Sequence, residues 1–389
     1  MRTLLALCFA LAACCCVFAQ EPATQVLITD RPPEVGIAGP GAPKHVIGLE
    51  RYSHEIVMDT GVKEYGLTYT VAHDKTRPGI AIPGEGYIGM PQPSGANWYA
   101  GGFFDLQING QTIGGIPLHS LTGRSVGNRG YVDFVFDTPD AVVRIRFVTL
   151  AGGDALYCQM LLEPKVEIKA LRVNVRCYPS GFISNGDRHV LTPTRDLAQG
   201  APADLALATE YWLLYYDKIY DEGYTTATAR GEGPCAVLFP GSQADKVGFT
   251  VGGYGTDTGM TLKQQLRDFR FVFFDFKGTK NDAARASLQQ RGPTLLQELA
   301  TFSFTDPSIA GFPLAQKQQE VQKALAQAPE EKEMAANYAK WSAELEKQLG
   351  LIKSGAAGAI MAEANAAKII ADWERGLPEL RLKALLREI

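Results

Sequence analysis

The stretch VDFVFDTPDAVVRIRF, residues 132–147, alternates apolar and polar side chains on both sides of a Thr-Pro-Asp turn. Val143, Ile145 and Phe147 share one face of the second half, and the arginines between them share the other, because successive side chains of a strand point to opposite sides. A period of two is typical of a half-buried strand. The stretch therefore predicts a pair of antiparallel strands with one apolar face and one wet face.

The same period recurs between residues 47 and 276. Phe104, Leu106 and Ile108 alternate with polar residues, and the Asn-Gly pair that follows them favours a tight hairpin turn. Many short alternating strands separated by Gly, Asn, Asp and Pro predict a mainly β fold, an antiparallel β-sandwich. The pattern leaves open one large sandwich or two smaller ones that meet near residues 196–206.

The pattern changes after about residue 280, where the helical period of 3.6 takes over. Proline favours the first turn of a helix, and glycine favours the position after its end. Helices are predicted over 313–327, from Pro329 to Gly350, over 355–375 and from Pro378 onward. The chain should thus consist of a β-sandwich region, 47–310, and a helical appendage, 311–389. We expect the helices to pack on one another or on the sheets, because no heptad pattern is sustained.

The N-terminus has the features of an export signal. Residues 1–19 combine Arg2, an apolar run and a small-residue cleavage site before Gln20. Alternatively, residues 11–14 resemble the lipobox of bacterial lipoproteins, in which Cys14 would be lipidated. We therefore expect an exported protein, periplasmic or secreted, or held at a membrane by lipid on Cys14. Residues 20–46 are rich in Pro and Gly, which predicts a linker or an extended arm along a sheet edge.

Composition excludes several classes of function. The chain is 46% hydrophobic and 21% charged, which is typical of a globular protein, and its net charge is −4. It has no Lys/Arg-rich block, so nucleic acid is not an expected partner. No uninterrupted apolar run after the leader approaches the length of a membrane span.

The cysteines and histidines give no metal or cofactor signature. Three of seven cysteines follow the leader: Cys158, Cys177 and Cys235. Cys158 and Cys177 lie in neighbouring strand-like runs and can pair as a disulfide in an oxidising compartment. The alternative is buried thiols that act as small apolar side chains. Because no Cys-x-x-Cys, His-pair, Walker or Gly-x-Ser-x-Gly motif occurs, we predict no metal and no cofactor, and the sequence favours a non-catalytic protein over an enzyme.

The segment YWLLYYDKIYDEGY, residues 211–224, is the first candidate ligand site. Sugars present apolar C–H faces and hydroxyl groups, so aromatic rings beside carboxylates suit them. The alternative is a core strand, since aromatic residues are favoured in strands. The candidate binding residues are Trp212, Tyr215, Tyr216, Asp217, Tyr220 and Asp221.

Residues 180–196 are the second candidate, with Asp187, Arg188 and His189 as binding residues. A histidine among arginines and aspartates can form an acid/base or anion-holding rim, and Arg172 and Arg176 of the preceding strand can join it. A solvated loop is the alternative. The glycine-rich segment 252–259 carries one carboxylate, Asp257, and is expected to be a turn rather than a calcium loop.

Three functions remain in competition. The first is an exported, non-catalytic β-sandwich protein that binds a glycan or a similar extended ligand. The second is a carbohydrate-active enzyme of the glycoside hydrolase type, with paired carboxylates drawn from Asp187, Asp217 and Glu222. The third is a cell-envelope scaffold or assembly protein that docks to a protein partner through residues 311–389.

Overall fold

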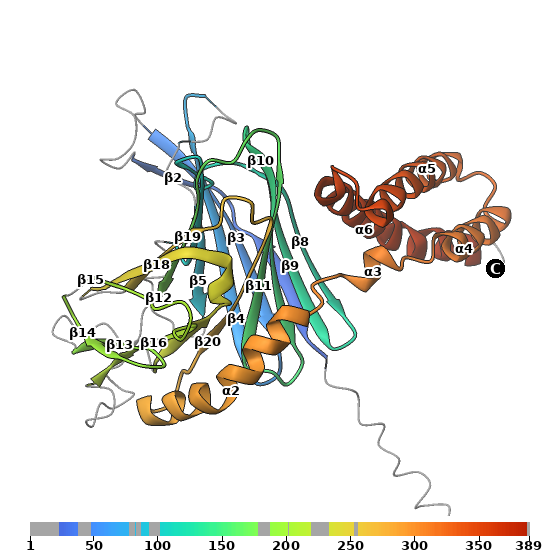
Figure 1. The fold of residues 1–389 in the computed structure, drawn as a ribbon. Helices are drawn as coiled ribbons and strands as arrows, with labels where there is room; N and C mark the ends of the chain where they lie inside the picture. The colour runs from blue at the N-terminus through green and yellow to red at the C-terminus, as the bar shows by residue number, and fades with distance from the viewer. Residues whose placement is uncertain are drawn as a thin grey trace, which may run out of the picture.

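The structure, a computed structural model, describes residues 23–37, 48–77, 82, 87–92, 102–177, 187–200, 202–218, 233–252 and 256–386. The predicted leader, including Cys14, lies outside these residues. Two antiparallel sheets face each other, and a group of helices extends from one side of them (Figure 1). This arrangement confirms the predicted β-sandwich with a C-terminal helical appendage.

Sheet A contains eleven strands. Its strands are β1 (Gln25–Asp30), β2 (Glu34–Ile37), β3 (Gly48–Asp59), β4 (Glu64–Asp74), β5 (Tyr87–Gln92), β6 (Phe104–Ile108), β7 (Gln111–Thr112), β12 (Leu171–Cys177), β15 (Pro202–Asp204), β18 (Ala244–Val251) and β19 (Thr256–Leu262). The order along the sheet is β1-β3-β4-β5-β6-β12-β19-β18-β15, with β2 on β3 and β7 on β6.

Sheet B contains nine strands, in the order β14-β13-β16-β17-β20-β11-β10-β9-β8. Its strands are β8 (Leu118–Val126), β9 (Arg129–Asp137), β10 (Ala141–Leu150), β11 (Ala155–Pro164), β13 (Arg188–Leu191), β14 (Asp196–Ala198), β16 (Trp212–Asp217), β17 (Cys235–Leu238) and β20 (Asp268–Asp275). Each sheet joins strands from both halves of the chain, so there is one large sandwich and not two smaller ones.

The alternating stretch 132–147 forms most of β9 and β10 with the expected pairing. Ile145 lies opposite Phe134, and Val143 lies opposite Phe136. Their side chains enter the core between the sheets, where Phe136 of sheet B meets Tyr69 of sheet A at 5.7 Å between ring centroids. Edge-to-face contacts of this kind add specific attraction to the burial of apolar area.

Cys158 is a free thiol, fully buried in this core. It lies on β11 of sheet B, whereas Cys177 ends β12 of sheet A, and the side chain of Cys177 lies outside the described part of the chain. In the structure Cys158 is thus a buried thiol, as the second interpretation predicted, and it is not bonded to Cys177.

Part of the predicted linker is a sheet edge. β1 and β2 both pair with β3, and Val26 of β1 packs against the core. Gly123 and Gly130 make this contact fit, because a Cβ at either position would lie 2.8 Å from a methyl carbon of Val26. Sequence analysis predicted no strands here, because proline is unfavourable inside a sheet. Its second interpretation, an extended arm along a sheet edge, agrees with the positions of β1 and β2.

A long helix, α2 (Asn281–Thr301), covers the outer face of sheet B. Leu288, Leu295 and Leu299 of the helix pack there with Trp212 of β16. Sequence analysis placed this segment in the sandwich region and predicted no helix before residue 313. Pro293 lies inside the observed helix. Gly292 lies close to Trp212: a Cβ there would lie 3.4 Å from the indole ring, at ordinary contact distance.

The appendage consists of four helices, α3 (Pro307–Ala310), α4 (Leu314–Gln327), α5 (Lys332–Ser354) and α6 (Ala359–Leu385). Two predicted ends are wrong: α5 passes Gly350 and ends at Gly355, whose φ of 61° suits glycine, and α6 runs continuously through Pro378. Pro378 is exposed, so water can satisfy the carbonyl that the proline leaves without a partner. No helix in the described part of the chain is long and apolar enough to cross a membrane.

Buried charges dock α6 onto sheet B. Arg146, fully buried, binds Asp133 through Nε and Nη2 at 2.5 Å and Glu363 of α6 at 2.8 Å; Arg144 also pairs with Glu363. Burial alone would raise the pKa of Asp133, but the Arg146 guanidinium holds that pKa below its ordinary value. The face predicted to be wet is therefore covered here, because carboxylates neutralise its arginines.

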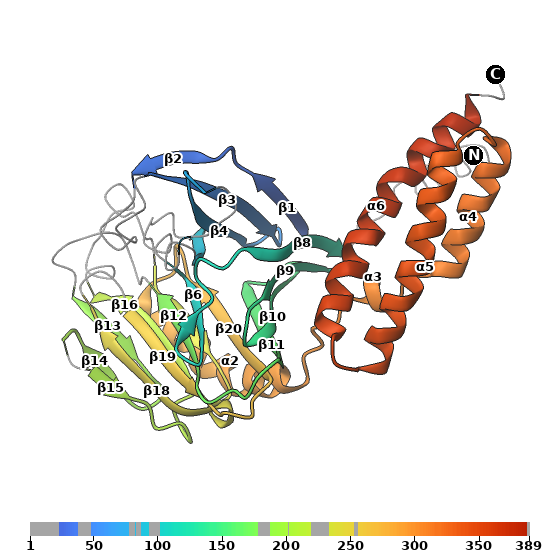
Figure 2. The same cartoon turned by 90° about the horizontal axis from the view of Figure 1, so that it is seen from above.

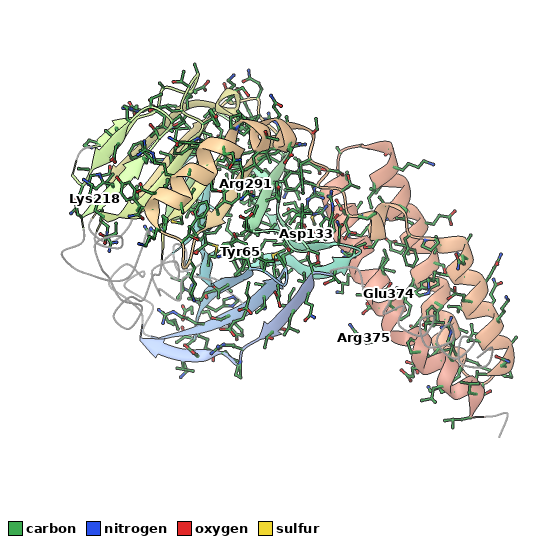
Figure 3. The ribbon with its side chains drawn as sticks, turned by 90° about the horizontal axis from the view of Figure 1, so that it is seen from below. Tyr65, Asp133, Lys218, Arg291, Glu374 and Arg375 are labelled. Carbon is green, nitrogen blue, oxygen red and sulfur yellow. The ribbon has the colours of Figure 1, made fainter. Side chains whose placement is uncertain are left out.

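Glu163 of β11 adds a second tie to the helices. Its two carboxylate oxygens accept hydrogen bonds from the backbone N–H groups of Gly358 and Ile360, each at 2.9 Å. A carboxylate at the N-terminus of a helix accepts hydrogen bonds from backbone N–H groups that have no partner within the helix, and it interacts favourably with the helix dipole. Figure 3 shows Asp133 close to the helices and Lys218, which follows β16, at the far end of the sandwich.

We expect Glu363→Gln to loosen the docking of α6. The substitution removes a negative charge that two buried arginines share, which should cost about 3 kcal/mol of unfolding free energy. Urea denaturation should show a lower midpoint, and hydrogen exchange should become faster in α6.

Glu374→Gln on the same helix is the matched control, because Glu374 is exposed (Figure 3). Its effect should stay within about 0.5 kcal/mol. Equal effects of the two substitutions would contradict the docking role of Glu363.

Candidate functional site

The two segments that sequence analysis treated separately are neighbours in sheet B. β13 pairs with β16, so that Arg188 lies opposite Asp217 and His189 lies opposite Tyr216. Alternation along the strands then sends one pair into the sandwich and the other outward.

Arg188 and Asp217 face inward as a buried ion pair. Arg188 Nη1 donates to Asp217 Oδ2 at 2.7 Å, and the two side chains are 1% and 2% exposed. Removing either side chain would leave the other charge buried without a partner, which is strongly destabilising. The pair therefore supports the edge of the sandwich, and neither group is presented to a ligand from solution.

His189 faces outward but is saturated by carboxylates. Its Nδ1 lies 3.0 Å from Asp196 Oδ1, and its Nε2 lies 3.1 Å from Asp187 Oδ1. Tyr216 donates its hydroxyl proton to Asp196 Oδ2 at 2.7 Å; burial and this hydrogen bond raise the pKa of Tyr216. With both ring nitrogens engaged, His189 fastens β13 to β14 and has no nitrogen left for the predicted acid/base role.

The aromatic segment is mostly core. Trp212 is 1% exposed beneath α2, and Tyr215 is fully buried between the sheets. Neither ring offers a face to a sugar, because sheet B is covered on both sides at β16. Tyr220 and Asp221, together with Glu222, lie outside the described residues.

An open groove of about 860 Å³ lies on the outer face of sheet A. It runs over β12, β19, β18 and β15, which lie side by side at one end of the sandwich (Figure 2). Its polar lining consists chiefly of Arg172, Asn174, Asp204, Lys246, Thr250 and Asp257. These side chains occupy the outward positions of strands whose inward positions fill the core, so a rigid sheet fixes their backbone positions.

Two exposed ion pairs flank the groove. Lys246 Nζ lies 2.9 Å from Asp204 Oδ2, and Arg176 Nε lies 2.7 Å from Asp257 Oδ1. Arg172 stands between them, and the described residues provide no ion-pair partner for it. Exposed pairs of this kind contribute little to stability, so their side chains are free to exchange partners with a ligand.

Glycines form the floor of the groove. A Cβ at residue 259 would lie 2.6 Å from Nη2 of Arg172, and one at residue 248 would lie 2.9 Å from Oδ1 of Asp204. The Arg172 guanidinium therefore lies against the bare backbone of β19. A side chain at either glycine would displace the groups that line the groove.

A buried carboxylate holds the β15 wall in place. Arg195 donates to the backbone carbonyl of Asp204 at 2.8 Å and to Glu210 at 2.6 Å. Glu210 also accepts hydrogen bonds from Thr192 and Thr194 at 2.5 and 2.6 Å. Burial alone would raise the pKa of Glu210, but these hydrogen bonds lower it to about 2.

Sequence analysis found some of these residues and missed others. Arg172, Arg176 and Asp257 were singled out, but the arginines were joined to the His189 region, whereas the strand register places them beside β19. Asp204 and Lys246 were missed, because neither belongs to a motif. The available signal was the alternation of polar residues and glycine along 244–262. The described residues contain no group of His, Cys, Asp and Glu that could hold a metal ion.

No family model matches the chain, and neither does any curated protein. Solved structures similar to it include a TPR-domain containing protein from Parabacteroides distasonis, with 8% identity, a TM-score of 0.37, and coverage of 66% of this chain and 56% of that one. A chondroitinase AC lyase has 8% identity, a TM-score of 0.35, and coverage of 60% and 38%. An α-N-acetylgalactosaminidase from Bifidobacterium bifidum has 11% identity, a TM-score of 0.36, and coverage of 67% and 39%. The chain thus spans about half or less of each protein's length.

We expect Trp212→Ala to destabilise the protein by about 3–5 kcal/mol, as large-to-small substitutions of core aromatic residues do. The denaturation midpoint should fall, with Lys218→Ala, an exposed change next to β16, as the control. If Trp212→Ala kept normal stability but lost glycan binding, the core position of Trp212 would be contradicted and its predicted role in stacking on a sugar would be supported.

The depressed pKa of Glu210 makes stability depend on pH. Because this pKa is lowered from about 4.5 to about 2, its stabilising contribution is present above pH 4.5 and is lost as pH falls toward 2. Glu210→Gln should lower the unfolding free energy at pH 7 and flatten its decline between pH 4.5 and 2. Parallel pH profiles for the two proteins would contradict this assignment.

Proposed function

We propose that this protein binds a glycan, or a similar extended polyhydroxylated ligand, without catalysis, in the groove on sheet A. The observation that carries the proposal is the groove of about 860 Å³ with donors and acceptors along a rigid floor. The leader predicted at residues 1–19 would place this groove outside the cytoplasm.

The lining has the chemistry that sugar hydroxyls require. Each hydroxyl both donates and accepts, and the groove offers cationic donors in Arg172 and Lys246, carboxylate acceptors in Asp204 and Asp257, and an amide in Asn174 that does both. The Asp204 and Lys246 side chains are 61% and 62% exposed, so the groove is open and accommodates a chain that continues past it. Strand-borne groups keep the ordering cost of binding low.

The carboxylates of the groove favour binding over glycoside hydrolysis. Hydrolysis needs one protonated carboxylic acid at the glycosidic oxygen and a second carboxylate across the sugar. Asp204 and Asp257 are each paired with a cation, and Asp217, one of the predicted catalytic acids, is held in the buried pair with Arg188.

Thr250→Trp should abolish glycan binding, because an indole placed on the exposed side of β18 fills the groove whatever sugar it accepts. Binding is measured on a glycan array and then by titration with the tightest glycan. We expect at least a tenfold loss of affinity with an unchanged unfolding midpoint.

Val62→Trp is the matched control. It adds the same ring at a position that is 66% exposed in the turn between β3 and β4, away from the groove. Binding that survives Thr250→Trp, or that Val62→Trp abolishes equally, would overturn the assignment of the groove.

A further inference from the structure

We infer that the ligand in the sheet A groove carries an anionic group, a carboxylate or a sulfate on a sugar unit, and that Arg172 binds it. This inference rests on the proposed function. It names the class of glycan, an acidic one, and the residue that selects it.

One cation of the groove has no ion-pair partner among the described residues. Lys246 is matched by Asp204, and Arg176 is matched by Asp257. Arg172 is exposed between these pairs, and no described residue gives it an ion pair or a side-chain hydrogen bond. Asp105 of β6 lies opposite Asn174, diagonal to Arg172, and accepts a hydrogen bond from Thr112. Arg172 is therefore the cation that a ligand anion can pair with without first breaking an ion pair.

The position of the guanidinium is prepared for recognition. A Cβ at residue 259 would lie 2.6 Å from Nη2 of Arg172, and 3.3 Å from both its Cζ and its Nε. Three atoms of the planar group thus lie over the same point of β19. The planar fork of an arginine matches carboxylate and sulfate oxygens, and the N–H groups of Arg172 are not engaged by another described side chain.

The neighbours of Arg172 suit the rest of a sugar unit. Thr261 of β19 lies opposite Arg172 on one side, and Gln107 of β6 lies opposite it on the other. Asn174 lies opposite Gly259 on the same outer face. The neighbouring outward positions thus carry a hydroxyl, two amides and the carboxylate of Asp105. These groups can pair with sugar hydroxyls while the guanidinium pairs with the anion.

The experiment compares matched acidic and neutral chains by calorimetric titration. Oligogalacturonate and its methyl ester test the carboxylate, and dextran sulfate and dextran test the sulfate. The wild-type protein should bind one acidic member more tightly than its neutral partner. Arg172→Gln should weaken binding of that acidic ligand by about tenfold to a hundredfold, the value of a charge-assisted hydrogen bond. Binding of the neutral partner should weaken by a clearly smaller factor, because it loses only a hydrogen bond to a hydroxyl.

Two further variants separate position from charge. Gly259→Ala keeps the net charge but moves the flexible end of Arg172, so it should also reduce the preference for the acidic chain. Lys246→Gln removes an equal charge from a cation that Asp204 already pairs, and it should have a much smaller effect. Thermal unfolding of each variant verifies that the fold is intact.

The outcomes distinguish the two proposals. Equal affinity for acidic and neutral members, equal losses for both in Arg172→Gln, or equal effects of Lys246→Gln and Arg172→Gln would overturn acid recognition while leaving glycan binding in place. If neither these four probes nor a glycan array with neutral, uronate and sulfated chains shows binding, both proposals are overturned.

Discussion

The structure depends on one constraint: at β16 and β20, sheet B carries apolar side chains on both faces. A sandwich buries only one face of a sheet, so the other face needs a separate cover. α2 provides it over Trp212 and its neighbours, and the segment leading to α6 continues the cover over β10. At β12, β18 and β19 of sheet A the outward positions are polar, and this face stays open. The same alternation that builds the core therefore separates a covered face, which supports the helices, from an open face, which holds the groove.

The covered face of sheet B is not uniformly apolar, and its charges determine where the helices sit. Arg144 and Arg146 project from β10 to a side where water is excluded, so carboxylates must accompany them. Asp133 comes from the neighbouring strand and Glu363 from α6. The bundle is thereby fixed by charge as well as by shape. This docking uses sheet B, so it leaves the groove on sheet A unobstructed.

Sequence analysis predicted the period-two strands, the single-faced core at β9 and β10, and the helices after residue 310, because these features are local. The features it missed depend on contacts across the chain. Trp212 looks like a binding platform in sequence, and only the packing of α2 shows that it is covered. α2 itself contains Pro293 in its interior, which a local pattern disfavours in a helix. Pro378 marks a helix start in sequence, yet it lies on the exposed side of a continuous helix.

The groove was harder still to predict. Arg172, Asp204 and Asp257 belong to three strands whose adjacency follows from the order β12-β19-β18-β15, which no local pattern encodes. Each residue alone is an ordinary exposed charge on a strand.

The position of β20 bears on how the chain folds. This strand lies between β17 and β11, and β11 ends at Pro164, whereas β20 spans Asp268–Asp275. Sheet B therefore stays in two pieces until a long intervening segment has been ordered and the loop closed. Such long-range pairing slows folding, and the unpaired, largely apolar edge of β11 is meanwhile open to association with other chains. Residues 268–275 thus act as the closing strand of the sandwich, and the time until they insert is the period in which the chain is most exposed to aggregation.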